Sequence, residues 1–129
     1  SLVPKAIEET ARWLSPVQSA TRVVAMDTEF QGVALARGDL VNCMLGSANR
    51  DALVFERPDE FDLERSDLSQ HLAFATGPHH CLGSHLARFE ARIALEALLA
   101  LPGFDIASAA EPRGYEFRQP PALHAVWRA

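Results

Sequence analysis

The segment from position 74 to 88 places a cysteine among glycines and histidines. It reads Phe-Ala-Thr-Gly-Pro-His-His-Cys-Leu-Gly-Ser-His-Leu-Ala-Arg, and Cys81 stands where a long run of helix-forming residues begins. A helix N-terminus favours negative charge, because its first N–H groups have no partner within the helix. The pattern therefore predicts that Cys81 is held as a thiolate, the form of cysteine that binds metals.

The side chains around Cys81 suit a haem-thiolate site. The sulfur of such a site needs backbone N–H donors close by, and Gly77 and Gly83 permit a close approach of the backbone. Phe74 can shield the sulfur from water, and His79 is placed to pair with a haem propionate. The segment thus predicts that Cys81 is the axial ligand of a haem iron.

Plainer roles are open to the same side chains. A free cysteine taken alone is most often a buried structural thiol, and a loop histidine such as His79 often bonds local backbone. His80, Cys81 and His85 also have the ligand types of a zinc site. His80 precedes the helix, however, and no fourth ligand is evident nearby, with His71 a distant candidate. The motif as a whole favours the haem ligand over these alternatives.

Two helices are expected to position this segment. Good helix formers run from about Leu82 to Leu101, and Pro102-Gly103 ends them. This helix is apolar on most sides, which predicts burial on most of its circumference, or a large apolar patch where covering neighbours are absent. A first helix begins near Pro4 and ends at Ser15-Pro16.

Glu9 and Arg12 lie on one face of that first helix. Their spacing of three residues lets the two side chains pair, although such pairs are common on solvated helices. Taken without further context, the pair would therefore indicate little about function.

The remaining segments predict short strands and loops. We expect strands at Arg22 to Met26 and Leu40 to Leu45, with a hairpin turn at 30–33 between them. Residues 46–70 predict a long irregular stretch with at most a short helix, and such stretches are usually functional or packed against another element. The tail at 104–127 predicts loose β structure. The fold class is therefore mixed α and β, mainly helical.

Composition limits the possible classes of protein. The length of 129 residues suits one domain. The apolar fraction of 48% and the charged fraction of 22% suit an ordinary globular protein. A formal charge of −5 argues against nucleic-acid binding. No phosphate-binding loop and no serine nucleophile elbow occurs. The two cysteines, Cys43 and Cys81, are too few for a disulfide scaffold and favour a reducing, cytoplasmic compartment.

The segment around Cys81 resembles the cysteine-loop signature of the cytochrome P450 family. The positions that fall in register are Phe74, Gly77, His79, Cys81, Gly83, Leu86, Ala87 and Arg88. Ala75 stands where the family usually has glycine, so we expect a small shift of the loop at most. Upstream, Glu9-Thr10-Ala11-Arg12 is similar to the Glu-x-x-Arg motif of the family's helix K, at the expected distance before the cysteine.

The resemblance implies roles for the residues outside the loop. Glu9 and Arg12 would be a structural pair that locks the meander loop beneath the haem. The position aligned with their usual third partner holds Glu60, which we expect to repel Glu9, and Arg57 or Arg65 could take its place.

Arg22 would be a second haem-propionate ligand by the same resemblance, although a strand arginine is often only solvated. The cofactor would be haem b (iron protoporphyrin IX). The implied reaction activates O₂ and inserts one oxygen atom into a small organic substrate. The implied electron donor is a ferredoxin or a flavoprotein reductase.

Residues 1–129 are expected to form the C-terminal haem-binding part of a P450 domain of the soluble bacterial type. This part would contain helix K, short β strands, the meander, the cysteine loop and helix L. The N-terminal part with helix I, which carries the proton-delivering groups, would be absent and would be a partner of this chain. No catalytic residue is therefore assigned, and we expect the isolated chain to be inactive. The alternatives are a split-gene partner and a truncated, non-catalytic remnant that binds haem weakly or not at all.

Overall fold

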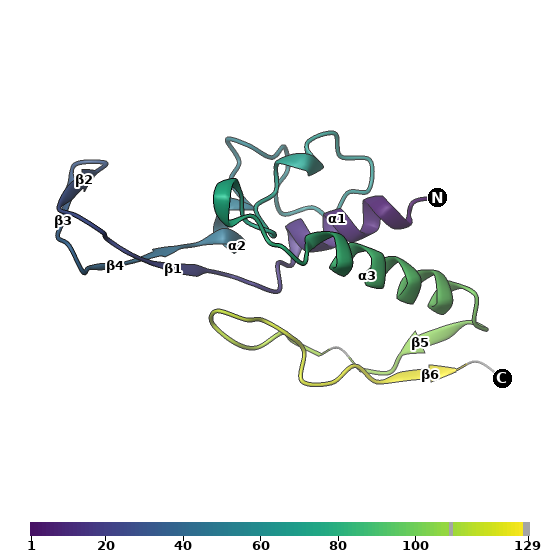
Figure 1. Cartoon of the computed structure of the whole chain (residues 1–129). Helices are drawn as coiled ribbons and strands as arrows, with labels where there is room; N and C mark the ends of the chain where they lie inside the picture. Colours follow the sequence, from purple (N-terminus) through teal and green to yellow (C-terminus); the bar gives the residue numbers. More distant parts are fainter. Residues whose placement is uncertain (109, 128–129) are drawn as a thin grey trace.

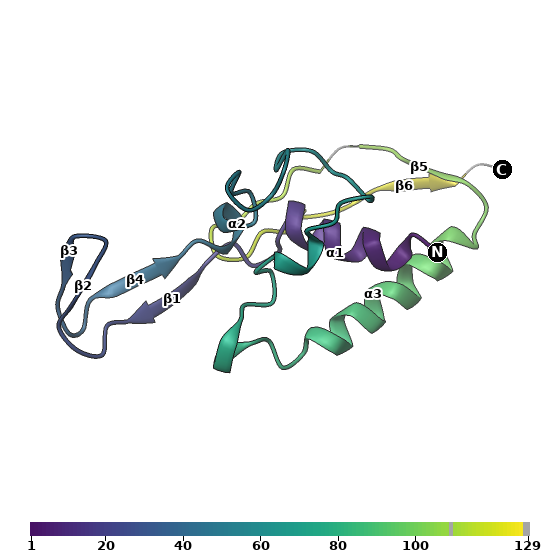
Figure 2. The ribbon, with the colours of Figure 1, turned by 90° about the horizontal axis from the view of Figure 1, so that it is seen from above.

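Helices and short antiparallel ribbons make up the protein in a computed structural model that describes residues 1–108 and 110–127 (Figures 1 and 2). The helices are α1 (Val3–Trp13), α2 (Leu45–Ala48) and α3 (Ser84–Leu99), with 3-10 turns η1 (Leu68–Gln70) and η2 (Gly77–His79). The strands are β1 (Ala20–Val23), β2 (Thr28–Phe30), β3 (Val33–Leu35), β4 (Leu40–Cys43), β5 (Phe104–Ile106) and β6 (Ala125–Trp127). This mixed arrangement agrees with the fold class that the sequence predicts.

The two long helices, α1 and α3, pack against each other. Pro4 lies in the first turn of α1, where a missing N–H costs nothing. Leu14 leaves the helical conformation, with φ −134°, directly before Ser15-Pro16. Both predicted helices are thus present, and α3 begins and ends two residues inside the predicted range.

The strands form three separate two-stranded antiparallel sheets in the described part of the chain. β1 pairs with β4, with Ala20 opposite Cys43. β2 pairs with β3 through a turn at Gln31 and Gly32. The φ angles of these two residues, 52 and 78 degrees, suit the two-residue hairpin that the sequence predicts. The ribbon of β1 and β4, with the β2–β3 hairpin at its end, extends away from the helices (Figures 1 and 2).

Two strand predictions need correction. β1 spans Ala20–Val23 rather than 22–26, since Val24 already bonds to the turn that leads into β4. β4 ends at Cys43, and Leu45 begins α2 instead of extending the strand. In the tail, β5 and β6 pair as the predicted β structure, with Phe104 opposite Trp127, whereas residue 109 lies outside the described residues.

The interior of the described chain is mainly polar. Val3 and Phe55 are the buried apolar residues. Glu9, Arg12 and Asn49 are 0% exposed. Buried charges are rare unless they are paired and hydrogen-bonded, so this cluster must satisfy its own polar groups.

Arg12 satisfies all of its N–H donors within the protein. A guanidinium has five such donors. Two of them, from Nε and Nη2, bond the carboxylate of Glu9 at 2.7 and 2.8 Å. The other three reach the carbonyl oxygens of Asn49 at 2.9 Å, Pro58 at 2.8 Å and Glu60 at 3.0 Å. Arg12 therefore fixes the backbone of a loop far from it in sequence.

Arg65 is the third partner of this pair, which settles the alternative that the sequence left open. Its Nε donates to Glu9 at 3.3 Å, and its other nitrogens donate to the carbonyl oxygens of Glu56, Arg57 and Glu60. The expected repulsion between Glu60 and Glu9 is wrong. The carboxylate of Glu60 instead pairs with the exposed side chain of Arg57 at 2.8 Å, and only its carbonyl faces the cluster.

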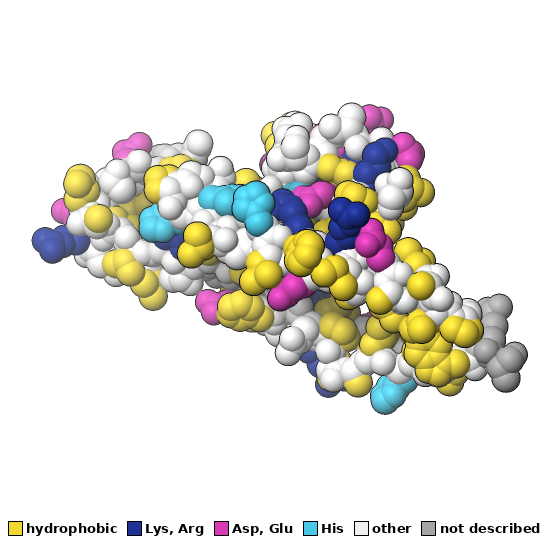
Figure 3. All heavy atoms as spheres, turned by 45° about the vertical axis from the view of Figure 1, so that its right-hand side comes forward, with side chains coloured by type: hydrophobic (Ala, Val, Ile, Leu, Met, Phe, Trp, Pro, Cys, Tyr) yellow, Lys and Arg dark blue, Asp and Glu magenta, His cyan; other side chains and the backbone are white. Residues whose placement is uncertain are grey.

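The long helix is far less buried than its composition predicts. Ser84 is its one buried residue, while Phe89 is 61% and Ile93 is 50% exposed. Leu86 and Leu99 are exposed as well, and Figure 3 shows hydrophobic side chains over much of the visible surface. This is the apolar patch expected where covering neighbours are absent.

No helix in the described part of the chain has both the length and the apolar character that a membrane span requires.

Replacing Arg65 by alanine should lower the free energy of unfolding by about 3 kcal/mol or more, because the carboxylate of Glu9 loses a buried partner. Urea unfolding followed by circular dichroism measures this loss. Arg57→Ala is the matched control, because its pairs with Glu60 and Asp62 are exposed. Exposed ion pairs contribute little, so we expect this control to change stability by at most about 0.5 kcal/mol. Equal losses in the two variants would contradict the role assigned to Arg65.

Candidate functional site

Cys81 lies in a closed loop directly before α3. Its N–H donates to the carbonyl of Phe74 at 2.8 Å, and its own carbonyl accepts from the N–H of Ser84 at 3.2 Å. The first of these bonds closes the segment between positions 74 and 81, and the second joins it to the first turn of the helix. The thiol is thereby held at a helix N-terminus, where negative charge is favoured.

The backbone at Gly83 lies close to the sulfur. A Cβ atom at this position would stand 3.9 Å from Sγ of Cys81, in ordinary van der Waals contact with it. Gly77 has φ +68°, a conformation that glycine adopts without strain. Gly83 therefore lies beside the thiol, whereas a Cβ at Gly77 would have no neighbour within 4 Å, and the roles predicted for both glycines at the sulfur stay predictions.

An apolar cavity of about 520 Å³ opens beside Cys81, between α1 and α3. Its walls include Ala11 from α1, Ala87 and Leu95 from α3, and Phe74 from the cysteine loop. Cys81 is unpaired and exposed, so its sulfur is available to a ligand. A soft sulfur donor beside apolar walls fits haem, which needs an axial ligand and an apolar surface for its ring.

Ala75 takes the left-handed conformation, with φ +55°, at the position where the sequence departs from the glycine signature. An L-residue with a Cβ is strained in this region. Neighbouring bonds hold it there, because its N–H donates to the carbonyl of Leu72 at 2.9 Å and its carbonyl faces Nδ1 of His80 at 3.3 Å. The strain is thus local, and the loop keeps the bond from Cys81 to Phe74.

His80 is occupied within the protein. Besides the carbonyl of Ala75, it contacts Oγ of Ser84 at 3.1 Å through Nε2. These contacts hold its ring against the loop and the start of α3, which argues against a shared zinc site with Cys81 and His85.

The two predicted propionate ligands lie on different elements. His79 ends η2 and is exposed. Arg22 lies in β1, also exposed, and its Nη1 donates to the carbonyl of Thr21 at 3.0 Å. Both side chains are accessible to a ligand, and their contacts with propionates stay predictions.

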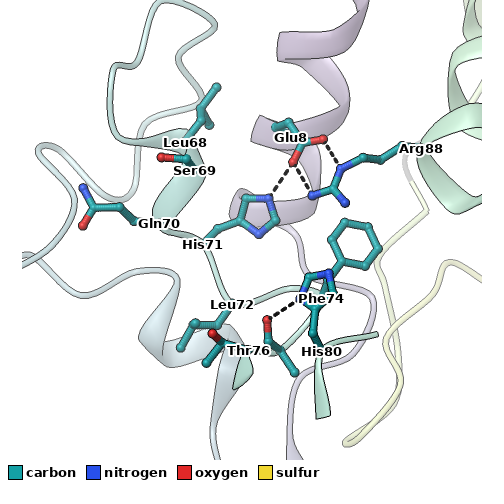
Figure 4. Close-up of a pocket in the computed structure, with 11 residues that line it drawn as sticks. Glu8, Leu68, Ser69, Gln70, His71, Leu72, Phe74, Thr76, His80 and Arg88 are labelled. Carbon is teal, nitrogen blue, oxygen red and sulfur yellow. Dashed lines mark hydrogen bonds and ion pairs between the residues drawn. The ribbon is translucent and has the colours of Figure 1, made fainter. Parts of the chain in front are cut away.

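A charged clamp that the sequence does not reveal joins three segments beside the loop. Glu8 of α1 accepts from Nε and Nη2 of Arg88 of α3 at 2.6 and 2.8 Å, and it contacts Nε2 of His71 at 2.9 Å. Figure 4 shows these side chains converging on the carboxylate. The guanidinium of Arg88 also lies 4.3 Å from the ring centroid of Phe74, which links the clamp to the cysteine loop.

The clamp shifts the pKa values of Glu8 and Arg88. The hydrogen bond from Arg88 lowers the pKa of Glu8, against burial, which raises it, and the contact with His71 lowers it further. The same hydrogen bond raises the pKa of Arg88, and the charge of Cys81 adds to this effect. Glu8 and Arg88 are 80 positions apart, so no sequence spacing could have paired them.

Comparison with known proteins identifies a family. The model of the family described as Cytochrome P450 matches residues 1–112. Cytochrome P450-terp of Pseudomonas sp is 46% identical over 99 residues, covering 77% of this chain and 23% of that protein. The biotin biosynthesis cytochrome P450 of Bacillus subtilis is 45% identical over 107 residues, covering 82% of this chain and 27% of that protein.

Solved structures share the fold. The crystal structure of P450BioI in complex with hexadec-9Z-enoic acid ligated acyl carrier protein matches with a TM-score of 0.90 and 40% identity. The match covers 98% of this chain and 34% of that one. The chain thus spans about a quarter of the length of the curated relatives and a third of the structural one.

Replacing Ala75 by glycine should raise the free energy of unfolding by about 0.5–1 kcal/mol, because glycine relieves the left-handed strain. Urea unfolding measures the change. Ala73→Gly is the control, since Ala73 does not have a positive φ. Glycine at position 73 should instead lower stability by a similar amount. A loss of stability in both variants would contradict the strain at position 75.

Glu8→Gln should make the stability of the protein depend less on pH in the acidic range. Because the folded pKa of Glu8 lies below its ordinary value of 4.5, its contribution is complete above that pH and is lost as the pH falls through the folded pKa. Melting temperatures between neutral pH and about pH 3 test this. The exposed Glu64→Gln should keep the wild-type profile, and an unchanged profile in Glu8→Gln would refute the clamp's contribution.

Proposed function

The chain belongs to the cytochrome P450 family of haem-thiolate monooxygenases, and on this premise we propose that Cys81 is the thiolate ligand of a haem iron. The observation that carries the proposal is the position of the thiol. It is unpaired, lies at the N-terminus of α3, and lines an apolar cavity with bare backbone beside it at Gly83. The cofactor that we propose is haem b.

The residues of the cysteine loop would hold this cofactor in distinct ways. Phe74 would shield the sulfur from water, while Gly77 and Gly83 leave room for backbone next to the thiolate. His79 and Arg22 would pair with the propionates, as exposed groups able to carry or donate positive charge. Glu9 and Arg12 do not line the cavity and brace the scaffold instead.

Two features of the protein would act on a thiolate at Cys81. Cys81 directly precedes the first turn of α3, where the helix dipole favours negative charge, and Arg88 of the same helix has a coulombic interaction with it. The guanidinium of Arg88 also stacks on the ring of Phe74 and so would help to hold this ring beside the sulfur. When bound, haem supplies the iron centre at which oxygen is activated.

The activity of the whole protein follows from the family. We propose that one oxygen atom of O₂ is inserted into a small organic substrate, with electrons from a ferredoxin or flavoprotein reductase. The acyl carrier protein bound to P450BioI shows that one relative was crystallised with a protein-linked fatty acid. The unpaired state of Cys43 and Cys81 supports a reducing, cytoplasmic location.

The exposed face of α3 supports a further part of the proposal. Residues 1–129 would be the C-terminal haem-binding part of a P450 domain, and its remaining part would cover Phe89 and Ile93. The relatives are about four times as long as the matched region, which leaves ample chain for that role. Without that remaining part only one face of the haem would be covered by protein, so we propose that the isolated chain is not a competent monooxygenase.

Reduced, carbon-monoxide-bound absorption spectra of the haem-loaded chain test the proposal. The wild type should show the red-shifted Soret band of thiolate ligation, and Cys81→Ala should lose it. Cys43→Ala is the matched control and should keep the band, because Cys43 lies in β4 and does not line the cavity. A wild-type chain without this band would overturn the proposal and favour a non-catalytic remnant.

A further inference from the structure

Asn49 is as fully buried as Glu9 and Arg12, and no role proposed for the haem site includes it. It follows α2 and is 0% exposed. A buried primary amide is costly unless its donors and acceptor find partners. We propose that Asn49 is a positioning residue that couples the Glu9–Arg12 pair to the cysteine loop; this inference rests on the haem-ligand role proposed for Cys81.

The side chain and the backbone of Asn49 bond three different segments. Oδ1 accepts the N–H of Leu72 at 2.6 Å, and Nδ2 donates to Oγ of Ser15 at 2.7 Å. Its carbonyl accepts Nη1 of Arg12 at 2.9 Å. Oγ of Ser15 in turn donates to the carbonyl of Ala11, a residue that lines the cavity beside the thiol. Asn49 thus joins the end of α1 to the chain that enters the cysteine loop.

The partners themselves fix the orientation of the amide. The N–H of Leu72 is only a donor, so it must face Oδ1 rather than Nδ2. Ser15 uses its single hydroxyl proton on Ala11, so it can only accept from Asn49. An apolar residue of similar size would satisfy neither group.

A short series of backbone bonds leads from Asn49 to the sulfur-bearing residue. Asn49 holds the N–H of Leu72, and the carbonyl of Leu72 accepts the N–H of Ala75 at 2.9 Å. Between them, the carbonyl of Phe74 accepts the N–H of Cys81 at 2.8 Å. The position of Leu72 therefore sets where the strained turn begins and where Cys81 is anchored.

Arg12 transmits the same constraint from the charged cluster. Its guanidinium is fixed by Glu9 and by three carbonyl oxygens, and one of those belongs to Asn49. The cluster holds the backbone of Asn49, and the side chain of Asn49 holds the loop. By this division the ion pair, which does not line the cavity, would act on the cysteine loop through Asn49.

Amide hydrogen exchange in the haem-free chain tests the coupling directly. In Asn49→Leu the amides of Leu72 and Cys81 should exchange at least about tenfold faster, because the loop opens locally. The amide of Val24, bonded to Asp39 within the ribbon, should change little. Asn42→Leu, the same substitution at an exposed position in β4, is the matched control.

Two further variants keep the test decisive. Asn49→Asp retains the acceptor for Leu72 and loses the donation to Ser15, so its exchange at Cys81 should rise clearly less than in Asn49→Leu. Should Asn49→Leu fail to fold, Ser15→Ala removes the partner of Nδ2, together with the bond from Oγ to the carbonyl of Ala11, and should still speed exchange at Leu72. Unchanged exchange at Cys81, an equal increase at Val24, or equal effects of Asn49→Asp and Asn49→Leu would overturn the inference.

The spectrum of the haem-loaded variant separates this inference from the proposed function. At equal haem content, Asn49→Leu should give a smaller share of the thiolate-type band than Asn42→Leu. A wild-type chain that lacks the band but shows the predicted exchange pattern would remove the proposed function and leave the coupling of Asn49 to the loop intact. A full band in folded Asn49→Leu would instead refute the positioning role alone.

Discussion

The buried guanidinium of Arg12 holds an irregular loop against α1 through hydrogen bonds to its backbone. All five of its donors end on the carboxylate of Glu9 or on the carbonyl oxygens of Asn49, Pro58 and Glu60. A long loop with little regular structure normally loses too much conformational entropy to stay ordered on its own. Charge-assisted bonds to its carbonyl oxygens offset that cost and hold the loop against α1. Through Asn49, the loop in turn bonds the segment that leads into the cysteine loop.

This polar interior explains why so little apolar surface is buried. Val3 and Phe55 are the buried apolar residues of the described chain, whereas the outer face of α3 presents Phe89 and Ile93 to the surface. A domain stabilised mainly by its hydrophobic core would bury that face. Here the hydrogen bonds define the loops around the thiol, and the outer face of α3 stays exposed in the described chain. The hydrogen bonds that order the site and the burial of apolar area therefore contribute separately to the stability of the chain.

The sequence could predict the parts of the site that depend on local pattern. The position of Cys81 before a long helix and the spacing of Glu9 and Arg12 in one helix both follow from short-range periodicity. It could not choose between Arg57 and Arg65, because that choice depends on how an irregular loop folds back. Glu8 with Arg88, and Asn49 with Leu72, are contacts between distant segments that carry no signal in spacing. The exposure of α3 depends on which neighbours are present, which its own composition cannot reveal.

Resonance Raman spectroscopy of the ferric, haem-loaded chain tests directly whether Cys81 is the haem ligand. The protein is prepared once with ordinary cysteine and once with cysteine that carries a heavy sulfur isotope. An iron–sulfur stretching band should appear and shift to lower frequency with the heavier sulfur, because the ligand is a cysteine thiolate. The band should persist in Cys43→Ala and vanish in Cys81→Ala. A haem-loaded chain without a sulfur-sensitive band, or with a band that survives the loss of Cys81, would show that Cys81 is not the haem ligand.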